Sequence, residues 1–262
     1  MRKSARQKCL ALLILLSTGF ASFTVESLGC GRKTGKVSHP SEGFDVNKTV
    51  VYFGSREIYG DFYTAIRSLL AHTDCRVITI TEDPDPFYDL PVHNIVYRGE
   101  WFNELNLQTK WRKFGPIRAA FTKILPEYDL VLSIDVDTIV QKDISALFDI
   151  DMTEYYFAAC KETKLSEPGR PYWNNGVCLM NLKKIREDKK DDQMIHALNT
   201  ESFRYVGQDV MTRYLDKVLE LPSDYNVCQF TAPTRNVIIR HYANRTDWRD
   251  LPEVTRYKSN QT

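Results

Sequence analysis

The sequence predicts one α/β domain with a mixed, mostly parallel sheet and helices on both faces. Short segments rich in β-branched and aromatic residues alternate with segments whose apolar residues recur at helical spacing. The chain has 262 residues, 43% of them hydrophobic, which is enough for one sizeable core. An apolar run at residues 130–134 also ends in closely spaced acids, and open α/β sheets keep their ligand crevices at such strand ends.

The first half of the domain begins with a strand and a helix. Residues 48–53 form a β-branched and aromatic run that Gly54 interrupts, and apolar residues at helical spacing follow over residues 58–70. Two more strands are expected at residues 76–81 and 92–97, because prolines punctuate the segment between them.

The second half continues the alternation. A helical pattern over residues 117–125 ends at Pro126 and leads into the strand at residues 130–134. No internal repeat is visible. The remaining elements are expected as strands at residues 155–160, 176–180 and 237–242, and as helices at residues 182–198 and 208–215.

Two carboxylates, Asp135 and Asp137, follow the strand at residues 130–134. Alternate side chains of an extended chain point to the same face, so both acids are expected to share one hard divalent cation. Two other Asp-x-Asp pairs lie at residues 83–85, beside prolines, and at residues 149–151, after a short helix-like run. Their context favours capping or solvated acids.

Charge and cysteine spacing exclude two classes of protein. The net charge of +1 leaves no basic excess for binding nucleic acid, so no nucleic-acid partner is expected. No Cys-x-x-Cys or histidine-rich spacing indicates a zinc site. Cys160 and Cys178 fall in expected strands, where buried thiols are the favoured interpretation.

The N-terminal residues predict a segment that contacts a membrane. Residues 1–8 contain four basic residues and are expected to be a cytosolic tail. The uncharged run at residues 9–25 is either a short signal anchor or a signal peptide cut near Ala21. Residues 26–47 are then a stem, residues 48–252 the folded domain and residues 253–262 a C-terminal tail.

Six short motifs follow one another along the folded domain. Each contains a polar or aromatic residue at or beside one end of an expected strand or helix. They are Tyr59 in the segment 58–61, Arg118, the acids within 133–140, Asn174-Asn175-Gly176 within 172–184, Gly207-Gln208-Asp209 within 207–211, and His241-Tyr242 followed by Asn244 and Arg245.

This order of motifs resembles the retaining glycosyltransferases of family 8, which include glycogenin, bacterial lipopolysaccharide galactosyltransferases and animal xyloside xylosyltransferases. The resemblance covers residues 48–248 and implies the GT-A fold, a single nucleotide-sugar-binding domain. It also implies a UDP-sugar as donor substrate and Mn2+, or Mg2+, as cofactor. In such a protein His241 would join Asp135 and Asp137 as the third metal ligand.

The resemblance further implies a set of donor-binding residues. Tyr59 would stack on the uracil ring, and Arg118 would contact the donor. Asn174 and Asn175 would contact the donor sugar, and Gly176 would let that sugar approach the backbone. The alternatives are that Tyr59 and Arg118 are ordinary surface residues, and that the Asn-Asn-Gly sequence is only a turn entering a strand.

Catalytic roles are implied for Gln208, which would line the β face of the sugar, and for Asp209, which would brace the site. Gly207 stands where relatives carry an acid that binds sugar hydroxyls, so the donor sugar stays open. Arg245 would neutralise the leaving group in place of a lysine found in relatives. Asn244 is a glycosylation sequon, and a glycan there would crowd the phosphates.

The expected activity is transfer of a sugar from a UDP-sugar to a hydroxyl of a glycan or glycoprotein, with retention through same-face attack. The expected location is a Golgi or ER membrane, as a single-pass type II protein with a lumenal catalytic domain, or secretion after cleavage. One alternative is a catalytically silent lumenal binding or scaffold protein of the same fold. A sugar nucleotidyltransferase is disfavoured, because residues 54–57 are not a glycine-rich phosphate loop.

Overall fold

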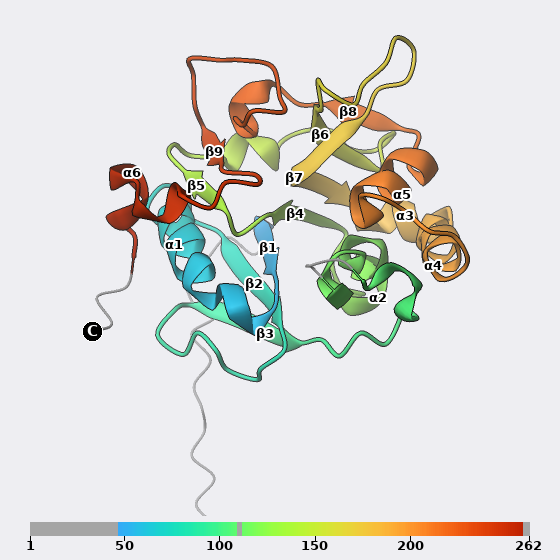
Figure 1. Ribbon diagram of the computed structural model, residues 1–262, viewed down its shortest axis with the longest axis horizontal. Coiled ribbons are helices and arrows are strands. Elements are labelled where there is room, and N and C mark those ends of the chain that lie inside the picture. Colours follow the sequence, from blue (N-terminus) through green and yellow to red (C-terminus); the bar gives the residue numbers. More distant parts are fainter. Residues whose placement is uncertain (1–46, 109–111, 259–262) are drawn as a thin grey trace, which may run out of the picture. The chain divides into compact units, whose positions relative to one another are not determined.

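A seven-stranded sheet with the strand order β3-β2-β1-β4-β7-β6-β8 runs through the protein, as the computed structural model shows (Figure 1). The structure describes residues 47–108 and 112–258, which belong to the unit Pro40–Thr262. The strands are β1 (Thr49–Phe53), β2 (Arg76–Thr81), β3 (Val92–Val96), β4 (Leu130–Ile134), β6 (Phe157–Lys161), β7 (Trp173–Asn181) and β8 (Val218–Glu220).

Six of the seven strands of this sheet run in one direction, and β7 runs in the other. Strands β1 to β4 are mutually parallel, whereas β7 runs antiparallel to both β4 and β6, and β8 pairs parallel with β6. A separate antiparallel ribbon joins β5 (Thr138–Val140) to β9 (Ile239–His241). The prediction of a mixed, mainly parallel sheet is therefore confirmed.

Helices cover both faces of the sheet, as predicted, and a separate hydrophobic core lies on each face. Helix α1 (Tyr59–Leu70) covers one face, and its side chains Phe62, Ile66 and Leu69 are fully buried. Burying each such side chain contributes about 1.5–3 kcal/mol. The other face packs against α2 (Phe121–Ile124), α3 (Leu182–Glu187), α4 (Lys190–Thr200) and α5 (Val206–Tyr214).

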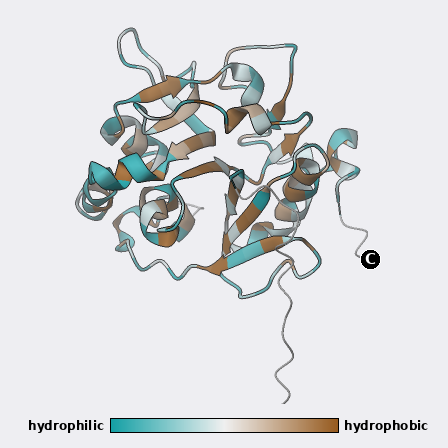
Figure 2. Ribbon diagram, turned by 180° about the vertical axis from the view of Figure 1, so that it is seen from behind, coloured by the Kyte–Doolittle hydropathy of each residue, from teal (hydrophilic) through white to brown (hydrophobic). Residues whose placement is uncertain are grey.

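The apolar residues follow this layering. Figure 2 shows that brown residues concentrate in the strands and that teal residues lie mostly on the outer helices and loops. Within β1, Val51 contributes to one core and Val50 and Tyr52 to the other. A central strand buried on both faces reads as a continuous apolar run, which is why the sequence identified it readily.

Two expected helices are interrupted. The pattern at residues 117–125 folds as a 3-10 turn, Ile117–Ala120, followed by the single turn of α2. The pattern at residues 182–198 breaks between α3 and α4 at Lys189, whose φ of 52° lies in the left-handed region. Lysine gives no signal for such a break, because glycine is the usual residue there.

Strand β7 extends the prediction, and strands β5 and β8 add to it. Strand β7 begins at Trp173, so Asn174, Asn175 and Gly176 lie within it and do not form a turn before it. Strand β8 was missed, because its three residues are only partly buried or exposed and carry no clear alternation. Short edge strands of this kind leave little pattern in a sequence.

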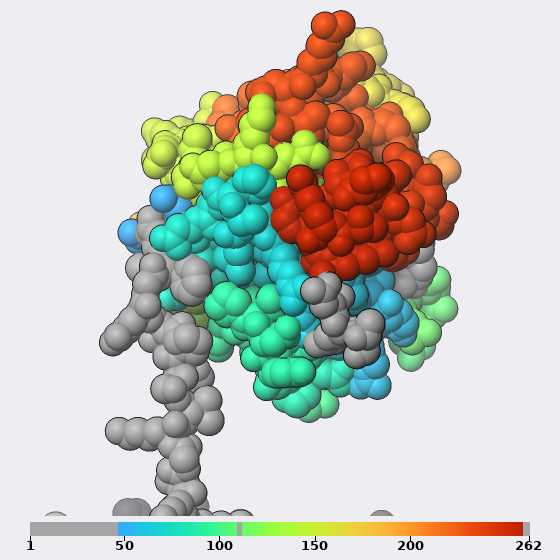
Figure 3. All heavy atoms as spheres, turned by 90° about the vertical axis from the view of Figure 1, so that its left-hand side faces the viewer, coloured from blue at the N-terminus to red at the C-terminus, as the bar shows by residue number. Residues whose placement is uncertain are grey.

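The C-terminal segment packs beside α1. Figure 3 shows this segment in red against the cyan residues of α1. The helix α6 (Pro252–Thr255) begins at the last residue of the expected folded domain, and Val254 is buried together with Trp248 and Tyr242. Short 3-10 turns complete the fold at Arg56–Ile58, Glu104–Asn106, Arg112–Phe114, Ser145–Leu147, Ser223–Tyr225 and Trp248–Asp250.

The expected cytosolic tail, signal segment and almost all of the stem, at residues 1–46, lie outside the described residues. Within residues 47–108 and 112–258, no helix has both the length and the apolar content needed to span a bilayer.

Cys160 and Cys178 are buried and free, which confirms their interpretation as buried thiols. Burial raises the pKa of Cys178 to about 12.

Candidate functional site

The acids Asp135 and Asp137 lie just beyond the carboxyl end of β4, which stops at Ile134. The chain bends there, and the hydroxyl of Thr138 donates to the carbonyl oxygen of Asp135 at 2.7 Å, which stabilises the bend. The backbone N–H of Asp135 donates to the carbonyl of Gly176 in β7 at 2.8 Å. The acids are thus brought together by a bend anchored to the sheet, and not by strand alternation as the sequence suggested.

His241 approaches both acids from the C-terminal part of the chain. Its Nε2 lies 3.3 Å from Oδ1 of Asp137 and 3.8 Å from Oδ2 of Asp135. Antiparallel pairing of β5 with β9 places His241 opposite Thr138, the residue after Asp137. One ligand atom from each of the three residues lies within 4.8 Å of the others, so the expected trio converges.

Gly176 provides the space for the imidazole. A Cβ built on Gly176 would lie 2.2 Å from Cε1 and 2.5 Å from Nδ1 of His241. The resemblance implied that this glycine makes room for an approaching sugar. In the structure it is the ring of His241 that requires a residue without a side chain.

Arg118 is buried beside the acids rather than exposed on a helix surface. Its Nη2 donates to Oδ1 of Asp135 at 2.6 Å, and its Nε donates to the hydroxyl of Ser133 at 2.9 Å. The guanidinium also lies over the ring of Phe53, 4.6 Å from the centroid. The structure therefore shows Arg118 orienting a candidate metal ligand, whereas the sequence expectation was contact with the donor.

The acids change the protonation of His241. Burial alone lowers the pKa of the imidazole, but the charge of Asp137 and a hydrogen bond to it, with contributions from Cys228 and Asp135, raise the pKa well above its ordinary value. The raised pKa means that Nε2 of His241 tends to carry a proton, and a divalent cation that takes Nε2 as a ligand has to displace this proton.

The residues present fit a divalent cation. Two carboxylates and one imidazole are ligands that suit Mn2+, and carboxylates alone suit Mg2+. Neither of the other Asp-x-Asp pairs is placed like this one. Asp83 pairs with Arg56 at 2.5 Å, and Asp151 accepts a hydrogen bond from the N–H of Thr153 at 3.0 Å, as expected of local or solvated acids.

Asn174 contributes to a buried network of polar side chains. Its Nδ2 donates to Oε2 of Glu162 at 3.1 Å, and its Oδ1 accepts from the N–H of Gly176 at 3.1 Å and from Nδ2 of Asn226 at 2.8 Å. Oδ1 of Asn226 in turn lies 2.8 Å from Nδ1 of His241. The structure thus joins Asn174 to the metal-ligand trio through Asn226.

Gln208 and Asp209 form a second group at the start of α5. Oε1 of Gln208 accepts from the N–H of Asn175 at 3.4 Å. Asp209 accepts hydrogen bonds from the hydroxyl of Tyr172 and, at 2.8 Å, from the N–H of Tyr205. These contacts tie α5 to β7 and support a bracing role for Asp209.

The glycine at position 207, where the resemblance implied an acid, has a steric explanation. A Cβ on Gly207 would lie 2.5 Å from the carbonyl oxygen of Gly115, a backbone atom that no side-chain rotation can remove. The backbone around Gly115 therefore excludes any side chain at this position.

Tyr59 begins α1 at the edge where β1 and β2 end, the same edge at which β4 delivers Asp135. Its ring packs edge-on against Phe62 and Phe87, and its hydroxyl accepts from the N–H of Glu82 at 3.3 Å. Tyr59 is therefore a half-buried, anchored aromatic residue at the ligand edge of the sheet.

Arg245 is exposed and makes a bidentate ion pair with Asp247, at 3.1 and 2.9 Å. The preceding Asn244 has a φ of 58°, a left-handed conformation that asparagine tolerates better than most residues. Asparagine is therefore compatible with the backbone of this turn.

Sequence reasoning missed several residues of the site. Arg249 makes a bidentate ion pair with Asp61 of α1, both bonds at 2.6 Å, and the negative charge of Asp137 contributes to the raised pKa of Arg249. Asn226 and Glu162 were also missed. None of them belongs to a periodic pattern or a short motif, so only their neighbours in space reveal them.

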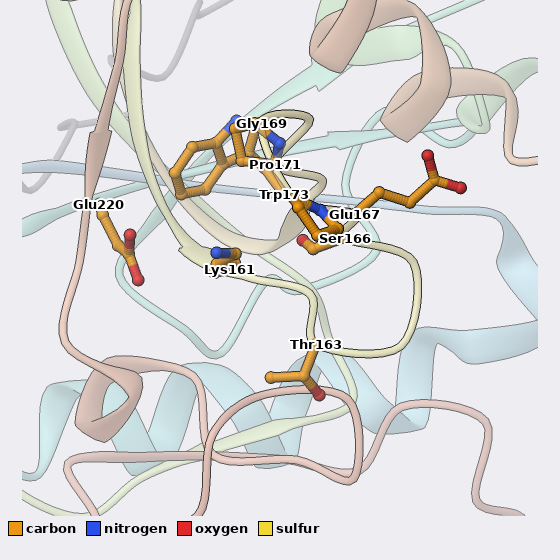
Figure 4. A pocket seen from close by; sticks show the side chains of 9 residues that line it. Lys161, Thr163, Ser166, Glu167, Gly169, Pro171, Trp173 and Glu220 are labelled. Carbon is orange, nitrogen blue, oxygen red and sulfur yellow. The ribbon is translucent and has the colours of Figure 1, made fainter.

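A surface hollow of about 580 Å³ lies away from these residues (Figure 4). Lys161, Trp173, Glu220 and the loop at residues 163–171 line it, and no sequence-predicted site residue does. Trp173 precedes Asn174 in β7, so the two side chains point to opposite faces of the sheet. The hollow is therefore separate from the candidate metal centre.

Known proteins resemble parts of this chain. A Haemophilus influenzae protein named as a glycosyltransferase is 30% identical over 107 residues, which cover 36% of this chain and 32% of that protein. The glycosyltransferase GlyD of Streptococcus pneumoniae is 29% identical over 162 residues, covering 57% of this chain and 19% of that protein. The chain therefore spans about a third or less of these curated relatives.

These relatives contradict the expected location in a Golgi or ER membrane. Both curated relatives are bacterial proteins, and bacteria have neither a Golgi nor an ER membrane. The prediction of a type II membrane protein with a lumenal domain is corrected accordingly.

The fold and the family are shown by two further comparisons. The solved structure of the galactosyltransferase LgtC, in complex with donor and acceptor sugar analogues, matches with a TM-score of 0.66 at 17% identity, covering 80% of this chain and 93% of that chain. This likeness shows the GT-A fold. Residues 101–246, more than half of the chain, match the model of Glycosyl transferase family 8. The chain therefore belongs to glycosyltransferase family 8.

Proposed function

We propose that this chain transfers a sugar from a UDP-sugar to an acceptor hydroxyl with retention of configuration, using Mn2+ or Mg2+. The observation that carries the proposal is the convergence of Asp135, Asp137 and His241 at the carboxyl end of β4. Two acids and one imidazole from distant segments meet where open α/β sheets bind their ligands. Asp135, Asp137 and His241 would hold a divalent cation there, and the cation would supply positive charge to a bound diphosphate.

Leaving-group charge is the main obstacle to breaking the bond between an anomeric carbon and a phosphate oxygen. A bound divalent cation would stabilise the negative charge of the departing diphosphate. Among the chain's own residues, Arg118 holds Asp135 in place through a 2.6 Å ion pair. Arg245 or Arg249 would supply further positive charge on leaving its ion pair with Asp247 or Asp61.

Donor recognition is assigned to residues along the same edge. We infer that Tyr59 stacks on the base, because its ring is anchored at the end of β1 and β2. Asn175 and Gln208, which share a hydrogen bond, are proposed to face the sugar. The amide of Asn174 belongs instead to the buried network that ends at His241. An amide is a poor nucleophile, so attack by the acceptor on the face that the diphosphate leaves is favoured over a covalent intermediate.

A silent binding protein of the same fold is the second candidate, because two specific observations favour it. The backbone of Gly115 excludes an acid at Gly207, and the guanidinium of Arg245 is already paired with Asp247. Both features weaken groups that relatives use to hold sugar and phosphate. Binding of UDP without turnover is what this candidate predicts.

A donor screen tests the proposal. UDP release is measured with UDP-glucose, UDP-galactose, UDP-xylose and their N-acetyl forms, in Mn2+, in Mg2+ and in EDTA. We expect metal-dependent release of UDP with one or more donors and loss of this release in Asp137→Ala. Asp151→Ala is the control and should release UDP normally, because Asp151 belongs to the Asp-x-Asp pair at residues 149–151 and not to the candidate metal site. Unchanged turnover in Asp137→Ala would exclude the assigned role.

Thermal unfolding and the turnover assay together separate the two candidates. Mn2+ with UDP should raise the melting temperature if either candidate is correct, because a ligand that binds only the folded state stabilises it. Stabilisation without hydrolysis or transfer of any donor would favour the silent binding protein. The acceptor is then sought among sugars and hydroxylated peptides with the donor that gives release.

A further inference from the structure

Four buried polar side chains form one continuous hydrogen-bonded row that ends at the candidate metal ligand. The row is Glu162, Asn174, Asn226 and His241, with exposed fractions of 3%, 5%, 0% and 5%. Its three links measure 3.1, 2.8 and 2.8 Å. We call these four residues the amide row.

The amide row has a defined direction. An ionised carboxylate only accepts hydrogen bonds, so Glu162 requires the NH2 group of Asn174 to face it. The backbone N–H of Gly176, 3.1 Å from Oδ1 of Asn174, can only donate and requires the same orientation. Two independent partners therefore turn the amide oxygen of Asn174 towards Asn226.

This direction continues to the imidazole. The oxygen of Asn174 accepts from Nδ2 of Asn226, which leaves the oxygen of Asn226 facing Nδ1 of His241 at 2.8 Å. An amide oxygen cannot donate, so Nδ1 has to carry a hydrogen. The neutral ring then presents the lone pair of Nε2 to Asp135 and Asp137, 3.8 and 3.3 Å away.

We propose that Asn226 is a positioning residue that holds His241 in its Nδ1–H tautomer and thereby presents Nε2 to a divalent cation, with Glu162 and Asn174 setting the direction of the amide row. The inference rests on the proposed metal role of His241. A histidine that ligates a metal through one nitrogen commonly donates from the other to an oxygen, which fixes the ring.

The cost of the arrangement supports a functional role. Oε1 of Glu162 is buried and has no hydrogen-bond partner among the described residues. Burial disfavours a carboxylate that is incompletely paired, and such groups are rare in folded proteins. An apolar residue at this position would avoid the cost but would remove one of the two partners that orient Asn174.

Histidine NMR tests the tautomer without any metal. The chain has five histidines, so the ring nitrogens of 15N-labelled His241 are assigned with a His241→Asn variant. In metal-free protein, titrated upward until the ring shifts stop changing, we expect the hydrogen on Nδ1. Asn226→Leu should lose this preference, whereas Asn226→Asp should keep it, because a carboxylate also accepts from Nδ1–H.

The pair of variants separates positioning from structure. Asn226→Asp places an oxygen against Oδ1 of Asn174, and Asn226→Leu removes the hydrogen bonds to Asn174 and His241. Urea unfolding should therefore show both variants to be destabilised. A purely structural role for Asn226 predicts that both variants lose the tautomer together, or that neither does. Either result, or a hydrogen on Nε2 in the wild type, would overturn the inference.

Metal affinity provides the second readout. Titration with Mn2+, followed by the electron paramagnetic resonance of the free ion, should show affinity weakened about 10–100-fold in Asn226→Leu and far less in Asn226→Asp. Equal affinity in wild type and Asn226→Leu would also overturn the inference. Failure of the proposed function is distinguishable, because it shows as absent turnover while the tautomer of His241 is unaffected.

Discussion

The imidazole of His241 occupies the space that a side chain on Gly176 would need, with Cε1 only 2.2 Å from the position of an ideal Cβ. The two residues come from β7 and β9, far apart in the sequence. Because the ring is buried and hydrogen-bonded to Asn226, it has little room to yield. The glycine and the histidine therefore depend on each other.

Gly176→Ala is expected to displace His241. Overfilling a packed site lowers the free energy of unfolding by about 1–3 kcal/mol, and the displaced ring should also lose its contribution to Mn2+ binding. Urea unfolding and Mn2+ titration measure the two effects.

Gly60→Ala is the matched control for this change. Gly60 lies in α1 with no atom within 4 Å of its added Cβ, so alanine there should raise the free energy of unfolding by about 0.4–1 kcal/mol. Normal Mn2+ affinity in Gly176→Ala would contradict the close packing of the ring.

Gly207→Ala is expected to destabilise the start of α5. Its Cβ would lie 2.5 Å from the carbonyl oxygen of Gly115, and overpacking against backbone costs about 1–3 kcal/mol. Gly207→Asp should be at least as unstable, so restoring the acid of relatives should not improve donor turnover. Urea unfolding tests the first expectation, and a gain of activity in Gly207→Asp would refute the second.

Mn2+ affinity is expected to increase with pH. The metal-free protein holds a proton on His241, because the neighbouring acids keep the pKa of this buried ring well above its ordinary value. That proton contributes stability below the unfolded pKa of about 6.5, and this contribution is lost as the pH rises through the folded pKa. Mn2+ has to displace the proton, so each pH unit below the folded pKa should weaken binding up to about tenfold.

Isothermal titration between about pH 6 and about pH 8 checks this dependence. His241→Asn removes the ionisable ring, so its weaker affinity should vary much less with pH. A wild-type affinity that is flat across the range would show that no proton leaves the ring on binding.

Arg118→Lys is expected to loosen Asp135. The guanidinium reaches Ser133 and Asp135 at once through two nitrogens, and a single ammonium group cannot satisfy both. Leaving the buried hydroxyl of Ser133 without its donor should cost about 1–3 kcal/mol in urea unfolding. Arg67→Lys, at an exposed pair with Asp89, should change stability by less than about 0.5 kcal/mol.

Much of the fold was predictable because its elements have regular periods. The strands β1 and β4 are largely apolar, β2 is rich in β-branched residues, and α1 carries apolar residues at helical spacing, so each was located within a residue or two. The short edge strand β8 and the break at Lys189 were not predicted. Both depend on how distant segments pack, which leaves no periodic trace in the sequence.

Some residues of the candidate site were likewise predictable from the sequence, and others were identified only from the structure. The sequence by itself determined the α/β class, the family and the pair Asp135 and Asp137, because strand pattern and motif order are local properties of the chain. Only the tertiary structure decided that Arg118 serves Asp135, that His241 fills the space above Gly176, and that Asn226 and Glu162 belong to the site. Those contacts arise when β5 pairs with β9 and β7 pairs with β4, and no single segment encodes such a meeting.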